Sequence, residues 1–239
     1  MVTILYRCKD YWVLEKPAGM SFHSESDDIG VMAYLQNAYP EYTFYPVHRL
    51  DKMTSGLLLV ACHKAAAKLF GELFEQHQIE KRYLALSNRK PNKKQGTISG
   101  GMQVSRRGQW KLTQSTDNFA QTQFFSSYIE SHRVFWLRPL TGKTHQIRVA
   151  LKSLGSPILG DKRYAGESSD RGYLHATVLA FEWQGELVCY RSWPNQGEHF
   201  SASLLAQVDQ CFDEVGLYWP KSKFQLKLGE LSFTERESE

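Results

Sequence analysis

The stretch HRLDKMTSGLLLVA, His48 to Ala61, joins a charged segment to a fully apolar run. The run 56–61 is short and apolar throughout, which predicts a strand buried on both faces. Asp51 precedes it, two residues after Arg49. An aspartate beside Thr-Ser-Gly is commonly a side-chain cap in a solvated turn. A turn anchored to a core strand, with Arg49 and His48 nearby, also fits an active site, and the stretch alone leaves both interpretations open.

The distribution of charge is more informative than its sum. The 239 residues are enough to bury a substantial core, and the net charge is only +4. Between Glu80 and Lys111, however, nine basic residues stand against one acid, and a second basic cluster runs from Arg133 to Arg163. Such clusters of positive charge favour a surface that binds a polyanion, although a solvated basic surface explains them equally well.

Cysteine and histidine spacing argues against a disulfide framework and against a metal site. The four cysteines are scattered without a CxxC pair, and the eight histidines show no HExxH or similar ligand spacing. The sequence has no signal-peptide pattern and no apolar run long enough to cross a membrane. We therefore expect a protein of the reducing cytoplasm with no metal ligands and no membrane partner.

Periodicity and turn residues predict a fold of the α+β class. Alternating or fully apolar runs predict strands over 3–6, 11–14, 56–61, 82–86, 123–128, 134–138, 174–183 and 187–191. Helical spacing predicts helices over 31–38, 64–77, 144–154 and 201–212, the first capped by Asp27 or Asp28. Residues 87–115 are rich in Lys, Gly, Gln and Ser, which predicts an exposed, loose hairpin. Strands outnumber helices without regular βαβ alternation, which indicates a mixed sheet.

Three further polar clusters lie outside the opening stretch, namely KRYLA (81–85), TGKTHQIR (141–148) and GDKRYAG (160–166). In a strand, Tyr83 shares one face with Lys81 and Ala85. The second cluster crowds the first turn of a predicted helix, where free backbone N–H groups favour anions. TGKT is not part of a phosphate-binding P-loop, because position 137 is leucine where GxxxxGK[ST] requires glycine.

In this order and at these separations, HRLDKMTSG, KRYLA, TGKTHQIRV, GDKRYAG and YLHA resemble the RluA-type pseudouridine synthases. LEKPAGMSFH is similar to the N-terminal motif of that family, and the resemblance covers residues 13–181. Five ordered matches arise together by chance far less often than any single one. The resemblance implies a mixed, largely antiparallel bent sheet with a central cleft and flanking helices.

The resemblance also implies an activity and a set of site residues. The family isomerises uridine in RNA to pseudouridine without a cofactor. By this resemblance Asp51 is the catalytic aspartate, Tyr83 packs against the target uracil, and Arg148 pairs with the aspartate. Arg49 is implied to help occupy the space of the flipped nucleotide, and Leu174 to line the pocket. The remaining substrate-binding residues are expected to be His48, Thr54, His145 and Gln146.

The chemistry of the reaction agrees with these roles. Breaking the C1′–N1 bond and forming C1′–C5 requires the uracil to detach, turn and reattach without escaping, in an apolar pocket with one carboxylate. A uridine within folded RNA must first be flipped out, at a cost of a few kcal/mol, and stacked on an aromatic ring such as Tyr83. A buried carboxylate needs a neighbouring cation to stay ionised, and Arg148 is the natural candidate for Asp51. Attack on C1′, addition to the base and removal of a sugar proton all remain open.

Two other functions are considered. One is a non-catalytic RNA-binding or assembly factor that kept the fold; the other is a metal-dependent phosphoesterase using His48, Asp51 and His145, which lack ligand spacing. We expect a single catalytic domain over 1–220, a charged tail over 221–239 and no separate N-terminal RNA-binding domain. The predicted partner is structured ribosomal or transfer RNA, selected by segment 87–115 and bound by a monomer.

Overall fold

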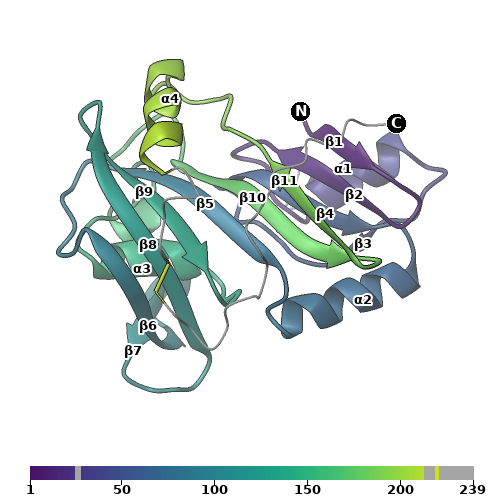
Figure 1. The fold of residues 1–239 in the computed structure, drawn as a ribbon, viewed down its shortest axis with the longest axis horizontal. Coiled ribbons are helices and arrows are strands. Elements are labelled where there is room, and N and C mark those ends of the chain that lie inside the picture. The colour runs from purple at the N-terminus through teal and green to yellow at the C-terminus, as the bar shows by residue number, and fades with distance from the viewer. Residues whose placement is uncertain (25–27, 213–218, 221–239) are drawn as a thin grey trace.

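The computed structural model describes residues 1–24, 28–212 and 219–220 (Figure 1). The strands are β1 (Thr3–Arg7), β2 (Tyr11–Lys16), β3 (Tyr45–Pro46), β4 (Ser55–Ala61), β5 (Glu80–Ser87), β6 (Gln95–Val104), β7 (Trp110–Thr113), β8 (Phe119–Ile129), β9 (His132–Pro139), β10 (Leu174–Trp183) and β11 (Glu186–Arg191). The α-helices are α1 (Val31–Ala38), α2 (Lys64–Glu75), α3 (Gln146–Ser153) and α4 (Ala202–Cys211). Two 3-10 turns, η1 and η2, cover Arg106–Gly108 and Lys162–Tyr164.

All these strands belong to one sheet of eleven strands. Its order is β1-β2-β4-β10-β5-β9-β8-β6-β7, with β3 beside β4 and β11 beside β10. Among the described strands, β4 and β10 pair in parallel and the other pairs are antiparallel. The predicted α+β class with a mixed, largely antiparallel sheet is therefore confirmed.

Strand β4 lies in the interior of this sheet, and all seven of its residues are buried, as the apolar run predicted. Its first residues lie beside the start of β10, with His175 opposite Ser55 and Ala176 opposite Gly56. Gly56 has a φ of +104°, and a Cβ atom there would come within 2.3 Å of the Ala176 carbonyl oxygen. Glycine is required at this contact. The turn that carries Asp51 is thereby held close to β10.

The hydrophobic core has two large parts on either side of the middle strands, and a small third cluster contains Met102, Ala120, Val149 and Tyr164. One part joins β1, β2 and β4 to α1 and α2, with Trp12, Leu58 and Phe70 fully or almost fully buried. The other joins β5 and β9 to α3 and α4, around Trp136 and Leu204. Figure 1 shows α2 beside the first part of the sheet and α3 against the strands of the second. Of the polar sequence motifs, KRYLA lies on β5 and HRLDKMTSG leads into β4.

Two predictions about helix starts are wrong. The helix predicted from residue 144 begins at Gln146, because His145 has a left-handed φ of 56° and cannot continue a helix. Helix α1 has Gly30 as its N-cap without a side-chain hydrogen bond, so Asp28 does not cap it. Asp28 instead forms an ion pair of 2.8 Å with Lys52. Asp27, the other predicted cap, lies outside the described residues.

The segment 87–115 forms the hairpin that was predicted, but as an ordered edge of the sheet rather than a loose excursion. Strand β6 pairs with β8 and, further along, with β7. Gly101 makes this close packing feasible, since a Cβ there would come within 2.7 Å of two carbonyl oxygens. The hairpin tip at η1 contacts η2, where the Gln109 amide donates to the Arg163 carbonyl oxygen at 2.7 Å.

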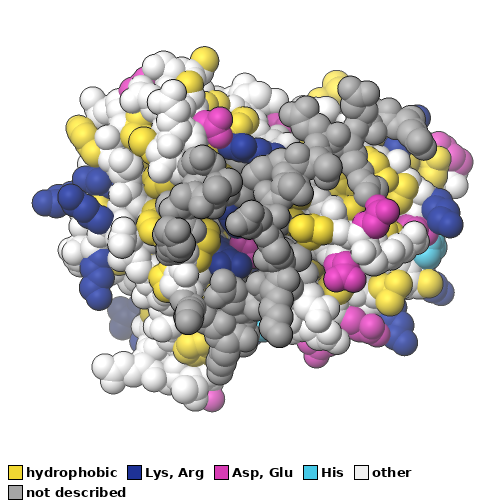
Figure 2. All heavy atoms as spheres, viewed as in Figure 1, with side chains coloured by type: hydrophobic (Ala, Val, Ile, Leu, Met, Phe, Trp, Pro, Cys, Tyr) yellow, Lys and Arg dark blue, Asp and Glu magenta, His cyan; other side chains and the backbone are white. Residues whose placement is uncertain are grey.

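Surface charge differs between the two parts of the molecule. Figure 2 shows lysine and arginine side chains along the left-hand edge, on the side of β6, β8 and β9, whereas acidic and basic side chains are interspersed on the right-hand half. None of the helices in the described ranges is both long and apolar enough to cross a membrane. The predicted tail 221–239 lies outside the described residues, and the single domain over 1–220 stays a prediction.

Candidate active site

A hollow of about 630 Å³ opens between the two parts of the core. It is lined by the loop before β4, the end of α2, the first residues of β5 and β10, and the turn between β9 and α3. All nine residues predicted for the site line this hollow, namely His48, Arg49, Asp51, Thr54, Tyr83, His145, Gln146, Arg148 and Leu174. The fold thus brings together motifs that lie far apart in the sequence.

Asp51 lies in a turn that hydrogen bonds hold in place. The Thr54 N–H donates to the Asp51 carbonyl oxygen at 3.0 Å, and the Gly19 N–H donates to the Lys52 carbonyl oxygen at 2.8 Å. The Lys16 ammonium donates to the same Lys52 oxygen at 3.3 Å. The Asp51 side chain is 21% exposed. The turn therefore presents a fixed carboxylate that a ligand can still reach.

Lys16 supports this turn, although the sequence analysis did not include it in the site. Its side chain is fully buried, and Nζ also donates to the carbonyl oxygens of Pro17 at 2.9 Å and Met20 at 2.7 Å. Burial, followed by the charge of Arg171, lowers the pKa of Lys16 to about 7. The motif LEKPAGMSFH contains this lysine, but nothing in that pattern indicates that three carbonyl groups surround it.

Arg148, in the first turn of α3, joins two acids. Its Nη1 donates to Asp51 Oδ2 at 3.0 Å, while Nε and Nη2 donate to the two carboxylate oxygens of Asp161 at 2.7 and 2.9 Å. The guanidinium also lies 5.0 Å from the centre of the Tyr164 ring. Burial alone would lower the pKa of Arg148, but its hydrogen bonds and the charges of both acids raise it. The pairing predicted between Arg148 and Asp51 is present.

Asp161 is the main site residue that sequence reasoning missed. It is 2% exposed and belongs to the GDKRYAG cluster, to which no chemical role was assigned. One signal was available, because Asp161 is the only acid within the second basic cluster of the sequence. A buried acid among many cations is expected to be paired. The sequence did not indicate which cation would form the ion pair with Asp161.

His145 is held by the residues around η2. The Trp110 N–H donates to the Tyr164 hydroxyl oxygen at 2.9 Å, and this hydroxyl lies 2.8 Å from His145 Nδ1. Since Tyr164 accepts from Trp110, its own proton is available to Nδ1, and we assign the Tyr164 hydroxyl as the donor and the imidazole proton to Nε2 on this basis. That Nε2 lies 4.0 Å from Asp51 Oδ1. Burial lowers the pKa of His145 despite the opposing charge of Asp51.

Tyr83 and Leu174 supply less polar walls of the hollow. Tyr83 lies on β5 opposite Leu137 of β9 and Ala176 of β10. Burial and the charge of Asp51 raise the pKa of Tyr83, so its hydroxyl remains protonated. Leu174, at the start of β10, is 3% exposed. As strand alternation predicted, Tyr83 and Lys81 both face this hollow, whereas the intervening residue of β5 does not line it.

His48 and Gln146 already use polar atoms within the protein. His48 Nε2 accepts from the Leu59 N–H at 2.9 Å, and burial, followed by the charge of Lys81, lowers the pKa of His48 to about 3. Gln146 makes four side-chain hydrogen bonds, to Thr141 Oγ1, Lys143 N–H, the Gln121 carbonyl oxygen and Thr122 Oγ1. Both side chains therefore fix the surrounding segments, and their predicted contacts with RNA stay predictions.

Arg49 is exposed and forms no hydrogen bond or ion pair with any residue in the described ranges. It lines the first hollow and also a second one of about 620 Å³. The two hollows share Leu50, Asp51, His145 and Arg148, so they meet at the Asp51 carboxylate. A chain-like ligand could therefore extend from Asp51 in two directions, with Arg49 lining both of them.

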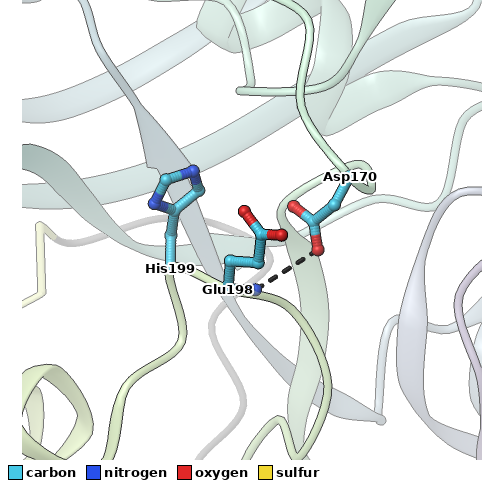
Figure 3. Close-up of side chains that lie close together, drawn as sticks. All are labelled: Asp170, Glu198 and His199. Atoms are coloured by element: carbon cyan, nitrogen blue, oxygen red, sulfur yellow. Dashed lines mark hydrogen bonds between the residues drawn. The ribbon is translucent and has the colours of Figure 1, made fainter.

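The geometry does not favour the metal-dependent phosphoesterase. His48 Nε2 accepts a hydrogen bond from a backbone N–H, so this atom is not available as a ligand. Elsewhere in the described residues, Asp170, Glu198 and His199 place one potential ligand atom each within 4.8 Å of one another (Figure 3). Asp170 already accepts from the Tyr173 hydroxyl at 2.6 Å and from the Glu198 N–H at 3.2 Å. The bond from Glu198 joins two loops, and the bond from Tyr173 fixes the Asp170 carboxylate within its own loop, which explains the cluster without a metal.

Comparison with known proteins identifies clear relatives. The sequence model for RNA pseudouridylate synthase matches residues 10–153. A Haemophilus influenzae protein named "Uncharacterized RNA pseudouridine synthase" is 46% identical over 223 residues, which cover 92% of this chain and 97% of that protein. The "tRNA pseudouridine synthase C" of Haemophilus ducreyi is 33% identical over 212 residues, covering 74% and 84%. Among solved structures, "Human RNA Pseudouridylate Synthase Domain Containing 1" matches with a TM-score of 0.71 and 26% identity, covering 90% and 95%.

Proposed function

The chain belongs to the RNA pseudouridylate synthase family and is an RNA pseudouridine synthase, and we propose that Asp51 is the catalytic group with which it isomerises uridine in structured ribosomal or transfer RNA. The observation that carries this proposal is the hydrogen bond of 3.0 Å between Arg148 and the Asp51 carboxylate at the meeting point of two hollows. The cation stabilises the ionised acid, and the partial exposure of Asp51 leaves it accessible to a nucleotide.

In the proposed reaction, the bond from C1′ to N1 breaks and the bond from C1′ to C5 forms. N1 gains a proton and C5 releases one, so that the product is an isomer of the substrate. Asp51 acts on the nucleoside in its ionised form, while Arg148 keeps the carboxylate oriented. Tyr83 stacks against the uracil and Leu174 closes the pocket beside it, which keeps the detached base in place while it turns. Thr54, His145 and Gln146 complete the surroundings of the nucleotide.

The target uridine must leave its RNA stack to reach this carboxylate. We propose that Arg49 fills the space that the flipped base leaves, because its side chain is exposed and has no partner in the described part of the chain. His48 supports the same loop by accepting from Leu59. The transfer-RNA name of the Haemophilus ducreyi relative is consistent with a structured RNA as substrate. The segment 87–115 is proposed to choose among such RNAs.

We further propose that the catalytic domain spans residues 1–220 and acts as a monomer in the cytoplasm. The four cysteines, at positions 8, 62, 189 and 211, are all free thiols. Free cysteines fit a reducing compartment. Size-exclusion chromatography with light scattering tests the monomer, since a dimer would double the measured mass.

Release of tritium from RNA labelled at uracil C5 tests the catalytic role of Asp51. The substrate is RNA from cells that lack the gene, so that its target uridines are unmodified. We expect wild-type protein to release tritium and Asp51→Asn to release none above background, because the amide is neither ionised nor nucleophilic. The matched control is Asp117→Asn, which changes an exposed aspartate on the β7–β8 loop and should retain full activity. Full activity of folded Asp51→Asn would remove Asp51 from the mechanism.

Mapping pseudouridines in RNA from cells with and without the gene identifies the substrate. We expect one or more positions in ribosomal or transfer RNA to lose modification without the gene and to regain it with the wild-type gene. Restoration by the Asp51→Asn gene would instead separate the modification from this carboxylate. The same RNA then becomes the defined substrate for kinetic work.

A further inference from the structure

Lys81 is a cation inside the hollow that has no acidic partner in the described part of the chain. It lies on β5 two residues before Tyr83, and both side chains line the hollow. Its ammonium donates to the Thr141 carbonyl oxygen at 3.3 Å and lies 5.9 Å from the centre of the Phe74 ring. Within residues 1–24, 28–212 and 219–220, it forms no ion pair with a carboxylate. A carbonyl oxygen and an aromatic face offset only part of the cost of burying this charge.

Lys81 is half-buried, and its partial removal from water affects its protonation. This burial lowers the pKa of Lys81 to about 8, although the charge of neighbouring Glu80 opposes the shift. By contrast, buried Arg148 is matched by two acids and its pKa is raised. Buried charges are usually paired, so an unmatched lysine in a ligand-binding hollow indicates that the ligand brings the opposite charge.

The structure leaves room in front of the ammonium. Gly142 lies in the turn between β9 and α3, and a Cβ atom there would be 3.9 Å from Lys81 Nζ with no nearer neighbour. Lys143 and His77 line the same end of the hollow. Burial, followed by the charge of Lys81, lowers the pKa of His77 below its ordinary value of 6.5. This histidine is therefore neutral at pH 7 and above. An anion can therefore approach Lys81 across Gly142 with Lys143 beside it.

We propose that Lys81, with Lys143 beside the Gly142 turn, forms a subsite for a backbone phosphate of the RNA adjacent to the target uridine. This inference rests on the proposed function, since it assumes that the target uracil stacks on Tyr83. Lys81 and Tyr83 are two residues apart on one strand face, which separates their Cα atoms by about 7 Å. A phosphodiester is the anion that every nucleotide beyond the target supplies, and lysine binds it as a point charge.

The salt dependence of RNA binding tests the charge of this contact. The probe is a synthetic RNA hairpin with uridines in its single-stranded loop, with affinity measured by fluorescence anisotropy over a range of salt concentrations. Each phosphate contact contributes about 0.7 to 0.9 to the slope of log affinity against log salt concentration. We expect Lys81→Gln to weaken binding about tenfold and to reduce the slope by one such contribution. The matched control is Lys68→Gln on α2, whose side chain is 81% exposed, and which should change neither quantity.

The pH dependence of binding tests the same contact independently. A bound phosphate favours charged Lys81, so affinity is greatest below pH 8 and declines as the free protein loses this proton above pH 8. Lys81→Arg stays charged and should keep its affinity through pH 9, which a purely structural role would not produce. The other charged or titratable side chains around this end of the hollow are His48, Arg49, Asp51, Glu75, His77, Glu80, Tyr83 and Lys143.

The outcomes separate this proposal from the proposed function. If folded Lys81→Gln keeps the wild-type salt slope, the phosphate contact is absent, even if affinity falls. An unchanged slope together with normal tritium release in the wild type would reject the subsite and retain the catalytic role of Asp51. If the wild-type protein releases no tritium but Lys81→Gln still reduces the salt slope, the proposed function alone is rejected. Should Lys81→Gln fail to fold by circular dichroism, the pH profile of Lys81→Arg decides.

Discussion

Asp161 accepts two hydrogen bonds from Arg148, of 2.7 and 2.9 Å, through Nε and Nη2, and this leaves Nη1 of the guanidinium for Asp51. Asp161 therefore holds the planar guanidinium of Arg148 in one orientation, and in this orientation Nη1 points to Asp51. Such two-bond pairs restrict orientation as well as supplying energy. Asp161 is consequently expected to position Arg148 without contacting the nucleotide itself.

The first prediction concerns Asp161→Asn. The amide cannot offer two anionic acceptors, so Arg148 should lose its fixed orientation toward Asp51. We expect kcat to fall on the order of 100-fold with little change in KM, because displacement of a reacting group by about 1 Å has effects of this size. Steady-state initial rates of tritium release over a range of RNA concentrations provide kcat and KM. The control is Asp209→Asn, which removes the exposed partner of Arg191 on α4. Wild-type kcat in folded Asp161→Asn would show that Arg148 needs no such support.

The second prediction concerns the Tyr164 hydroxyl, which links the Trp110 N–H to His145 Nδ1. Tyr164→Phe retains the ring beneath Arg148 but removes the donor to Nδ1. We expect ¹⁵N chemical shifts of His145 to change from a single Nε2–H tautomer to a mixture. The kcat should fall several-fold, in keeping with about 1 kcal/mol for one hydrogen bond. Tyr128→Phe, at a tyrosine that is 66% exposed, serves as the control. An Nδ1–H tautomer in the wild type would contradict the proposed direction of these bonds.

The third prediction concerns stability below neutral pH. Burial lowers the pKa values of His48 and His175 to about 3, from an ordinary value of 6.5. Between pH 6.5 and 3, these two histidines therefore bind protons in the unfolded chain but not in the folded protein. We expect the free energy of unfolding, measured in urea, to be greatest above pH 6.5 and to fall steadily as the pH is lowered toward 3. His48→Gln can still accept from Leu59 but does not titrate, so its stability should fall less steeply.

The sequence was sufficient for elements that depend on local pattern. The apolar run after Asp51 predicted buried β4, and the ordered motifs predicted which distant residues would share one hollow. Helix α2 was predicted from residue 64, where it begins, because its apolar spacing is regular. Such features follow from the period of the side chains along one element.

Features that depend on the choice of a distant partner could not be predicted in this way. Asp161 pairs with Arg148 thirteen residues away on another element, and Lys16 at the end of β2 donates to the Lys52 carbonyl oxygen in the turn that carries Asp51. The left-handed φ of His145 interrupts a pattern that is helical on both sides of it. That conformation depends on tertiary contacts such as the one with Tyr164, which helical periodicity does not report.

The final prediction concerns a buried charge cluster on β5 and β9. Glu80 forms ion pairs with Arg82 at 3.0 Å and with Arg138 at 2.7 Å, so both guanidinium groups contact the same acid. The Trp219 ring covers both guanidinium groups, at 5.6 and 5.7 Å from their central carbons, and packs against Phe125. Cation–π contacts of partly desolvated arginines contribute about 1 to 2 kcal/mol each. Trp219 is therefore expected to stabilise β5, the strand that carries Tyr83.

Trp219→Ala should admit water to the two arginines and lower the free energy of unfolding by about 2 kcal/mol, measured in urea. Trp219→Phe keeps an aromatic face and should recover about half of this loss. Trp193→Ala is the matched control, because Trp193 also lies over an arginine, Arg191, but at the half-exposed end of β11. Equal losses in Trp219→Ala and Trp219→Phe would assign the effect to the volume of the indole rather than to the cations. Wild-type stability in Trp219→Ala would show that the ring does not support the cluster at all.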